Sequence, residues 1–334
     1  MRAAEPCRPG MAAVPRGKGC PVTRFAVPLL ALALVACSSP PVAADGVTVR
    51  NCGRAQTFAA PPTRVVGLNQ HATEMLLALG LADRVVGTAY PDTPDAHPSV
   101  DAAYDRVPLL AEQYPTYEEL LTAEPDLVVG GYASAFAEKD GRAREALEGK
   151  GIRTFLLSEE CSAGTTVDTV VEDLRALGRV FGVPDRAEAL VSDLTGRVEA
   201  VRAKVAGRAE VPVFFYDSGE KSAFTVGGHG LGNSIAALAG GRNVFADHPK
   251  SFVDVSWEQV AERSASAVVV VDYLGSGSVA EKQEYLRAHP LASTLPGVAQ
   301  RRFAVVTLPE LTEGIRFPDA VEAIARVLHP GAGW

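Results

Sequence analysis

Asn, Gln, His, Tyr and Arg side chains lie at the ends of several short β-branched segments, which predict strands, or in the loops that follow them. Ligands of open α/β sheets bind at the carboxyl ends of the strands, so these side chains are expected to surround a ligand. Tyr, His and Arg together suit a bulky, partly aromatic, anionic ligand. The candidate ligand-binding residues are Asn69, Gln70, His71, Tyr90, Tyr132, Tyr216, His229, Tyr273 and Arg316.

Three of these candidates have a second interpretation. Arg316 is expected to hold a ligand carboxylate through its planar guanidinium, or else to form a salt bridge with Glu313 or Asp319. His71 and His229 could both ligate the metal of haem or a corrinoid, or could simply hydrogen-bond to the chain or the ligand. A site for a bare metal ion is not expected, because no His, Asp, Glu or Cys cluster has the spacing of metal ligands.

Sequence motifs of catalysis are missing. The chain contains no Gly-x-Ser-x-Gly and no His-Glu-x-x-His segment, and Gly219–Ser222 lacks the leading glycine of a phosphate-binding loop. We therefore expect a binding protein without a cofactor rather than an enzyme.

A similar segment occurs twice, 140 residues apart. Each copy opens with a hydroxyl residue that is followed three positions later by Glu or Gln, the pattern of a helix capping box. In the first copy, Glu119 is the expected capping partner of Thr116. Glu118 and Glu258 occupy matching positions in the first helical turn, where a carboxylate can either meet a partner or complement the helix dipole. The two copies cover residues 116–130 and 256–270.

Two α/β units are needed to position these side chains. From residue 64 the sequence alternates strand and helix patterns, which predicts parallel α/β layers. Two helices then interrupt the alternation, and apolar residues recur with a helical period through the second one. A helix of that length is about 30 Å long, which is enough to bridge two lobes. The expected fold is α/β, with two Rossmann-like lobes (47–184 and 207–334) joined by one long helix (185–206) and a ligand cleft between the lobes.

The first 46 residues are expected to be a leader and a tether. Basic residues precede a 12-residue apolar run, Phe25–Ala36, which is too short to span a bilayer and is typical of a secretory signal over 1–36. The residues around Cys37 resemble a lipobox, so Cys37 is the expected site of lipid attachment and 37–46 the tether. The alternative is an ordinary signal with an incidental cysteine, and Met11 is an alternative start of the chain.

Charge and cysteine content restrict the partners and the compartment. The formal net charge is −8, and the leader carries five basic residues and one acidic residue, so the remaining chain carries −12. Such an acidic protein is not expected to bind nucleic acid. Of the five cysteines, only Cys52 and Cys161 remain after the leader and Cys37. In an oxidising compartment they form either one disulfide or two independent buried thiols.

Several motifs, taken in their order, resemble one family. The segments Pro62–Leu68, Thr73–Leu81, Asp83–Gly87, Glu124–Val129 and Gly240–Phe245 are similar to motifs of the substrate-binding proteins of ABC importers for iron–siderophore complexes and cobalamin. The resemblance extends from about residue 48 to residue 328.

This resemblance implies a monomeric lipoprotein on the outer face of the cytoplasmic membrane of a bacterium. The protein would capture a ferric siderophore, whose own oxygens hold the iron, and deliver it to the permease and ATPase of an ABC importer. Glu118 and Glu258, one on each lobe, would form salt bridges with permease arginines. A corrinoid or haem carrier of the same family is the alternative. An extracytoplasmic enzyme or a ligand sensor on the same scaffold is an alternative of another class.

Overall fold

The structure is a computed structural model that describes residues 46–334. The expected leader, the lipid-attachment site Cys37 and nearly all of the tether therefore lie outside the described residues. Within 46–334, every helix is too short or too polar to span a bilayer.

The N-terminal lobe is built on a five-stranded parallel sheet with the order β5-β4-β3-β6-β7. Alternate residues of the central strands enter two different apolar clusters: Val65 and Val129 belong to one, and Val66 and Val128 to the other. Both faces of the sheet are therefore covered, as parallel sheets require. The elements are β3 (Val65–Gly67), α1 (Gln70–Ala78), β4 (Val85–Ala89), α2 (Asp101–Tyr104), β5 (Leu109–Ala111), α3 (Tyr117–Thr122), β6 (Leu127–Gly130), α4 (Arg144–Glu148) and β7 (Arg153–Leu156).

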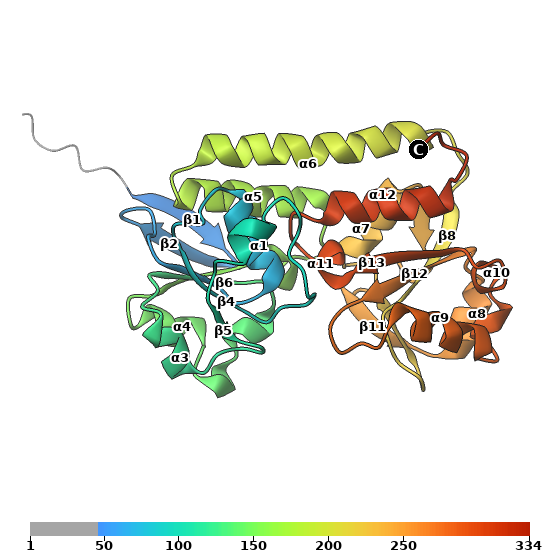
Figure 1. Cartoon of the computed structure of the whole chain (residues 1–334), viewed down its shortest axis with the longest axis horizontal. Helices are drawn as coiled ribbons and strands as arrows, with labels where there is room; N and C mark the ends of the chain where they lie inside the picture. The colour runs from blue at the N-terminus through green and yellow to red at the C-terminus, as the bar shows by residue number, and fades with distance from the viewer. Residues whose placement is uncertain (1–45) are drawn as a thin grey trace, which may run out of the picture. The chain divides into compact units, whose positions relative to one another are not determined.

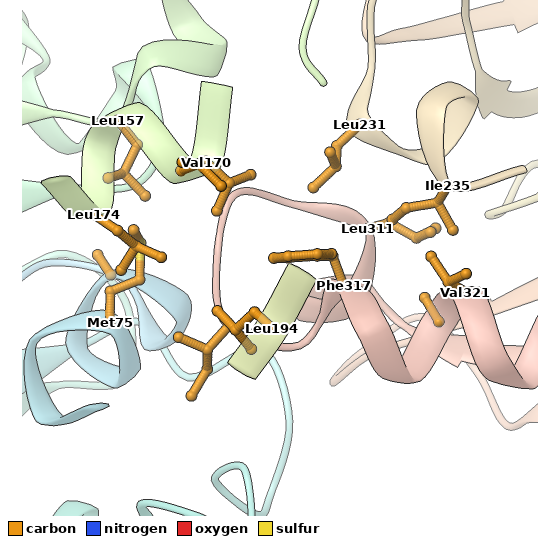
Figure 2. Packing of buried hydrophobic residues seen from close by; sticks show 14 of the residues in the cluster. Met75, Leu157, Val170, Leu174, Leu194, Leu231, Ile235, Leu311, Phe317 and Val321 are labelled. Atoms are coloured by element: carbon orange, nitrogen blue, oxygen red, sulfur yellow. The ribbon is translucent and has the colours of Figure 1, made fainter. Parts of the chain in front are cut away.

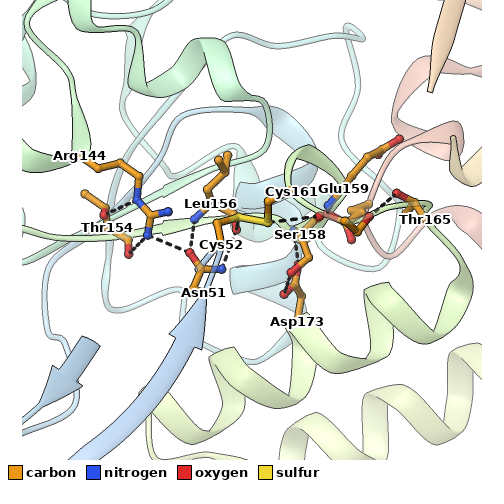
Figure 3. Close-up of a disulfide and its surroundings, with 12 residues drawn as sticks. Asn51, Cys52, Arg144, Thr154, Leu156, Ser158, Glu159, Cys161, Thr165 and Asp173 are labelled. Carbon is orange, nitrogen blue, oxygen red and sulfur yellow. Dashed lines mark hydrogen bonds between the residues drawn. A yellow bond between two sulfur atoms is a disulfide. The ribbon is translucent and has the colours of Figure 1, made fainter. Parts of the chain in front are cut away.

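An antiparallel hairpin, β1 (Val47–Asn51) and β2 (Arg54–Phe58), precedes this sheet and is attached to β7. The buried Asn51 side chain donates to the Leu156 carbonyl (2.7 Å) and accepts from the Leu156 N–H (2.9 Å). A disulfide joins Cys52 in the hairpin turn to Cys161 after β7 (Figure 3). It is the first of the two possibilities that the sequence left open for these cysteines, and it ties the hairpin to the segment that follows β7.

The C-terminal lobe contains a four-stranded parallel sheet with the order β10-β8-β12-β13 and a separate antiparallel pair, β9 and β11. Its strands also alternate between two clusters, with Phe215 and Val269 in one and Phe214 and Val268 in the other. The elements are β8 (Val211–Tyr216), β9 (Ala223–Val226), α7 (Leu231–Leu238), β10 (Gly241–Asn243), β11 (Phe252–Val255), α8 (Trp257–Arg263), β12 (Ala267–Asp272), α9 (Val279–Ala288), α10 (Pro296–Ala299), β13 (Phe303–Thr307), α11 (Leu308–Leu311) and α12 (Phe317–Leu328).

One long helix, α6 (Pro184–Val205), joins the lobes, after α5 (Val167–Val180) has ended the N-terminal lobe. Pro184 occupies the first turn of α6, where its missing N–H costs nothing. Figure 1 shows α6 lying across both lobes, beside α5 and α12. The fold class predicted from the sequence, two α/β lobes joined by a long helix, is confirmed, and the bounds of α6 differ from the expected 185–206 by one residue.

A single apolar cluster continues from one lobe into the other. Figure 2 shows Met75 and Leu174 on the N-terminal side, Leu194 of α6 in the middle, and Phe317 and Val321 on the C-terminal side. Because these side chains are buried together, the lobes are held by hydrophobic packing as well as by one covalent connection.

Candidate ligand cleft and docking residues

A cleft of about 370 Å³ lies between the two lobes. One backbone hydrogen bond crosses it, from the Leu274 N–H to the Asp92 carbonyl (2.8 Å). Three of the ligand residues predicted from the sequence, Tyr90, Tyr132 and Tyr273, line this cleft. The other lining residues are Pro91, Asp92, Glu112 and Gln113 of the N-terminal lobe and Leu274, Gly275 and Leu308 of the C-terminal lobe.

Tyr90 forms part of the N-terminal wall in a strained backbone conformation. Its φ is +53°, a left-handed value that costs a non-glycine residue about 1–3 kcal/mol and that clusters at ligand sites. The Tyr90 ring packs against Tyr114, with 4.8 Å between the ring centroids. Burial raises the pKa of Tyr114, whose hydroxyl lies 2.9 Å from the Ser134 hydroxyl. Tyr114 was missed by the sequence reasoning, although it follows the strand Leu109–Ala111 by only three residues.

Asn69 is fully buried beneath this wall instead of facing the cleft. Its side-chain oxygen accepts from the N–H groups of Gly131 (2.8 Å) and Tyr132 (3.3 Å). Its amide nitrogen donates to the Tyr114 hydroxyl (3.0 Å). Asn69 therefore connects two aromatic residues of the wall rather than contacting a ligand.

Gln70 is also buried, with 1% exposure, and all its hydrogen-bonding capacity is directed to one loop. Its oxygen accepts from the N–H groups of Asp92 (2.8 Å) and Thr93 (2.8 Å). Its nitrogen donates to the Thr93 hydroxyl (2.9 Å) and the Asp95 carbonyl (3.0 Å). Gln70 thus fixes the loop that brings Asp92 to the cleft.

The two candidate metal-ligating histidines are not presented together to the cleft. His71 is 1% exposed, its ring packs edge-on against Tyr132, and its Nδ1 lies 3.7 Å from Asp92 Oδ2. His229 is half-buried and is not among the cleft-lining residues; its carbonyl accepts from the Thr165 N–H (2.8 Å). In the part of the chain that the structure describes, no group of three His, Cys, Asp or Glu residues could hold a metal ion.

Tyr216 lies in the core of the C-terminal lobe, where only 4% of its surface is exposed. Its ring stacks on Tyr285, and its hydroxyl donates to the Gly219 carbonyl (3.1 Å). Burial, the first cause, raises the pKa of this phenol. The expectation that Tyr216 faces the ligand does not agree with this placement, because the last residue of β8 points into the sheet packing rather than toward the cleft.

Arg316 has a partner that the sequence did not suggest. It forms a two-pronged ion pair with Glu74 of α1, in the other lobe, with Nε to Oε2 at 2.7 Å and the second contact from a terminal nitrogen to Oε1. That nitrogen also donates to the Asp95 carbonyl (3.0 Å). Burial alone would lower the pKa of Arg316, but its hydrogen bonds and its charge interaction with Glu74 raise it. Arg316 thus ties the lobes together and is not free to hold a ligand carboxylate.

Apart from the tyrosines, the ionisable side chains that line the cleft are carboxyl groups. Asp92 and Glu112 are among the lining residues, and within the described chain none of the lining residues is Lys or Arg. Three of the predicted tyrosines line the cleft, whereas Arg316, the cation that was expected to meet an anionic ligand, does not.

Glu118 and Glu258 both lie exposed in the first turns of short helices, α3 and α8. The capping boxes predicted for both helices are confirmed, with Glu119 as the partner of Thr116. Hydrogen bonds from its own backbone N–H and from Ser256 hold the pKa of Glu258 below its usual value. Figure 1 shows α3 and α8 on the side of the lobes that faces away from α6.

Comparison with known proteins identifies the family. Residues 65–310 match the model of the periplasmic binding protein family, so the chain belongs to it. The chain is 27% identical over 212 residues to the vitamin B12-binding protein of Photorhabdus laumondii, which is 63% of this chain and 71% of that protein.

The fold of the chain is also similar to solved structures of transport binding proteins. A periplasmic binding protein from Veillonella parvula has a TM-score of 0.78 and 28% identity, over 86% of this chain and 98% of that one. An ABC-type Fe3+-hydroxamate transport system from Saccharomonospora viridis has a TM-score of 0.73 and 26% identity, over 85% and 99%.

The chain is therefore a solute-binding protein of an ABC importer, of the class whose members bind siderophores, vitamin B12 or haem. This family binds and does not catalyse, and the protein works outside the cytoplasm.

Proposed function

We propose that this protein captures a metal chelate with no net negative charge, and that a ferric hydroxamate siderophore is the first candidate. The observation that carries the proposal is the composition of the cleft: three tyrosines, two carboxylates and no lining cation. The tyrosines offer flat apolar surface and hydroxyl groups, which suit the periphery of a chelate. The iron, as cargo, would be held by the oxygens of the siderophore itself.

The charge of the cleft argues against strongly anionic chelates. Two like charges about 4 Å apart repel by roughly 1–4 kcal/mol in surroundings between bulk water and a protein surface. A catecholate chelate or the propionates of haem would meet Asp92 and Glu112 without a compensating lining cation, since Arg316 is paired with Glu74. A neutral or cationic chelate avoids this cost.

A corrinoid is the second candidate, because relatives that carry the name vitamin B12-binding protein align with much of the chain. A corrinoid meets the same requirement, since its macrocycle carries amide side chains instead of carboxylates. The binding site proposed for either ligand consists of Tyr90, Tyr132 and Tyr273.

The proposal is tested by titrating the purified protein with a panel of chelates in a calorimeter and a thermal-shift assay. The panel contains ferrioxamine B, ferrichrome, cyanocobalamin, a ferric tricatecholate and haemin. A hydroxamate or the corrinoid should bind, and at 100 times its Kd it should stabilise the fold by about 2.7 kcal/mol. Tight binding of only the tricatecholate or haemin would overturn the proposal.

A charge-reversed variant sharpens this test. Glu112→Lys places a cation on the exposed rim of the cleft, so it should weaken binding of a cationic chelate and improve that of an anionic one. Glu262→Lys makes the same change on α8, at an exposed residue that does not line the cleft, and should leave both affinities unchanged. Equal effects of the two variants would mean that the cleft charge does not select the ligand.

Delivery is proposed to depend on Glu118 and Glu258, which would pair with basic groups of the permease, while acylated Cys37 holds the monomeric protein at the membrane. Support comes from the equivalent placement of the two glutamates in exposed helical turns. Glu118→Arg with Glu258→Arg should abolish uptake without changing the Kd for the ligand. Normal uptake by this variant would contradict the docking role of the two glutamates. The lipid anchor is tested separately, and a Cys37→Ser protein that stays membrane-bound would contradict it.

A further inference from the structure

Tyr273 supplies the aromatic part of the cleft wall on the C-terminal lobe, directly after β12. Its hydroxyl does not point freely into the cleft, because it donates to Asp217 Oδ1 at 2.8 Å. One face of its ring is covered by the ammonium of Lys282, with Nζ 4.9 Å from the ring centroid. The ring is therefore held both at its hydroxyl and on one face.

The two groups that hold the ring are themselves buried and fixed. Asp217 is 2% exposed and Lys282 is 5% exposed. The Lys282 ammonium donates to the carbonyls of Asp217 and Val271, both at 2.6 Å. Two carbonyls and an aromatic face together replace the water that a buried ammonium loses. Burial lowers the pKa of Lys282 and raises that of Asp217, as expected for charges kept out of water.

The backbone of Tyr273 is fixed as well. The Ser276 hydroxyl donates to the Tyr273 carbonyl (2.7 Å), which closes a tight turn. Gly275 sits in that turn with φ +82°, a value that favours glycine. Leu274, the residue that follows Tyr273, donates its backbone N–H across the cleft to the Asp92 carbonyl.

We propose that Asp217 and Lys282 are positioning residues that hold Tyr273 as a preformed wall for the ligand. The inference rests on the proposed function only in so far as the ligand is a chelate that packs against this ring. Because the hydroxyl is already committed to Asp217, Tyr273 meets the ligand through its aromatic surface. A side chain that is already fixed loses no rotational freedom on binding, which is worth about 2- to 12-fold in affinity.

The experiment is a double-mutant cycle on the Kd for the panel chelate that binds the wild-type protein. Asp217→Ala and Tyr273→Phe each remove one end of the same hydrogen bond, so each should weaken chelate binding by about 2- to 12-fold. The double variant should bind the chelate as tightly as either single variant, because the bond can be lost only once. Asp217→Asn keeps an acceptor and should restore most of the affinity. Lys282→Met removes the charge beneath the ring and should also weaken binding.

A matched control is Tyr285→Phe, which deletes a hydroxyl that donates to the Glu220 carbonyl (2.9 Å) in the same lobe without lining the cleft. Its Kd should equal that of the wild type. Multiplicative effects of Asp217→Ala and Tyr273→Phe in the cycle, or unchanged affinity in both, would overturn the positioning role.

Ring-labelled tyrosine NMR separates the two proposals. The Tyr273 resonance should report a slowly flipping ring in the wild type and a faster one in Asp217→Ala, with or without ligand. If no chelate of the panel binds, the proposed function fails while this spectrum still decides the positioning role. A ring that flips equally fast in both proteins would refute that role.

Discussion

The buried ion pair between Glu74 and Arg316 gives the sharpest stability prediction. Glu74 is 0% exposed and Arg316 is 7% exposed, and the two belong to different lobes. Arg316→Met leaves a buried carboxylate without its cation, which typically costs about 3–5 kcal/mol. Glu74 keeps a hydrogen bond from the His97 N–H (3.1 Å). We therefore expect the free energy of unfolding to fall by about 3 kcal/mol, the lower end of this range.

The double variant Glu74→Leu with Arg316→Met should be more stable than Arg316→Met alone. Replacing a whole buried ion pair by apolar side chains is often neutral or stabilising. The His97 N–H still loses its acceptor, at about 1 kcal/mol, whereas the Asp95 carbonyl loses one donor but keeps those from Gln70 (3.0 Å) and Thr93 (2.9 Å) and costs less. The net loss is therefore expected to be about 2 kcal/mol or less.

Urea denaturation at pH 7.5 measures these free energies of unfolding. Arg326→Met is the control, since Arg326 and Glu322 form a pair that is half exposed to solvent, and such pairs contribute about 0–1 kcal/mol. The two single variants are Arg316→Met and Glu74→Leu. If the double variant loses as much free energy of unfolding as these two combined, the reasoning is refuted, because residues that do not interact give additive losses.

Three further changes test other parts of the structure. Replacing Cys52 and Cys161 by serine removes a cross-link over 109 residues, so urea denaturation should show a loss of about 2–5 kcal/mol; an unchanged midpoint would mean that the bond contributes nothing. Gly131→Ala would place a Cβ in steric conflict with the His71 ring, so it should cost about 1–3 kcal/mol of stability and weaken ligand binding, whereas wild-type values for both would contradict the packing of the cleft wall. Burial raises the pKa of Asp173 to about 6, so its contribution to stability is full below about pH 4 and lost as the pH rises through 6. Relative to Asp173→Asn, the wild type should lose up to about 3 kcal/mol between pH 4 and 7, and parallel pH profiles of the two proteins would refute this.

Local sequence patterns were sufficient for the fold. The two capping boxes, the helical period of α6 and the alternation of strands and helices depend on residues that are close in the chain. The repeat extends further than the sequence indicated. Glu124 and Ser264, eight residues after the two capping hydroxyls, both adopt a left-handed φ, of 47° and 48°.

The site was only partly predictable. The rule that ligands meet the carboxyl ends of strands predicted three residues that line the cleft, Tyr90, Tyr132 and Tyr273. It cannot say which way a side chain turns after the strand. Asn69 and Tyr216 follow or end strands and yet point into the protein. Their partners are set by tertiary packing, which leaves no local pattern.

The partner of Arg316 could not be predicted from local sequence patterns either. Its partner Glu74 is 242 residues away in the sequence, and nothing near either residue signals the pairing. The nearby carboxylates Glu313 and Asp319 were the natural expectation, but Asp319 pairs with Arg197 and His97 instead. Only the approach of the two lobes reveals that Arg316 is committed and that the cleft has no lining cation.

The most direct test of the charge selectivity is a series in which one chelate changes only its charge. Ferrioxamine B (+1), its N-acetyl form (neutral) and its N-succinyl form (−1) share one iron centre, and cyanocobalamin can be paired in the same way with its carboxylic acid derivative. Calorimetry should give the lowest Kd for the cationic or neutral member of whichever series binds, and the highest for the anionic member. Tightest binding of the anionic member would contradict the account.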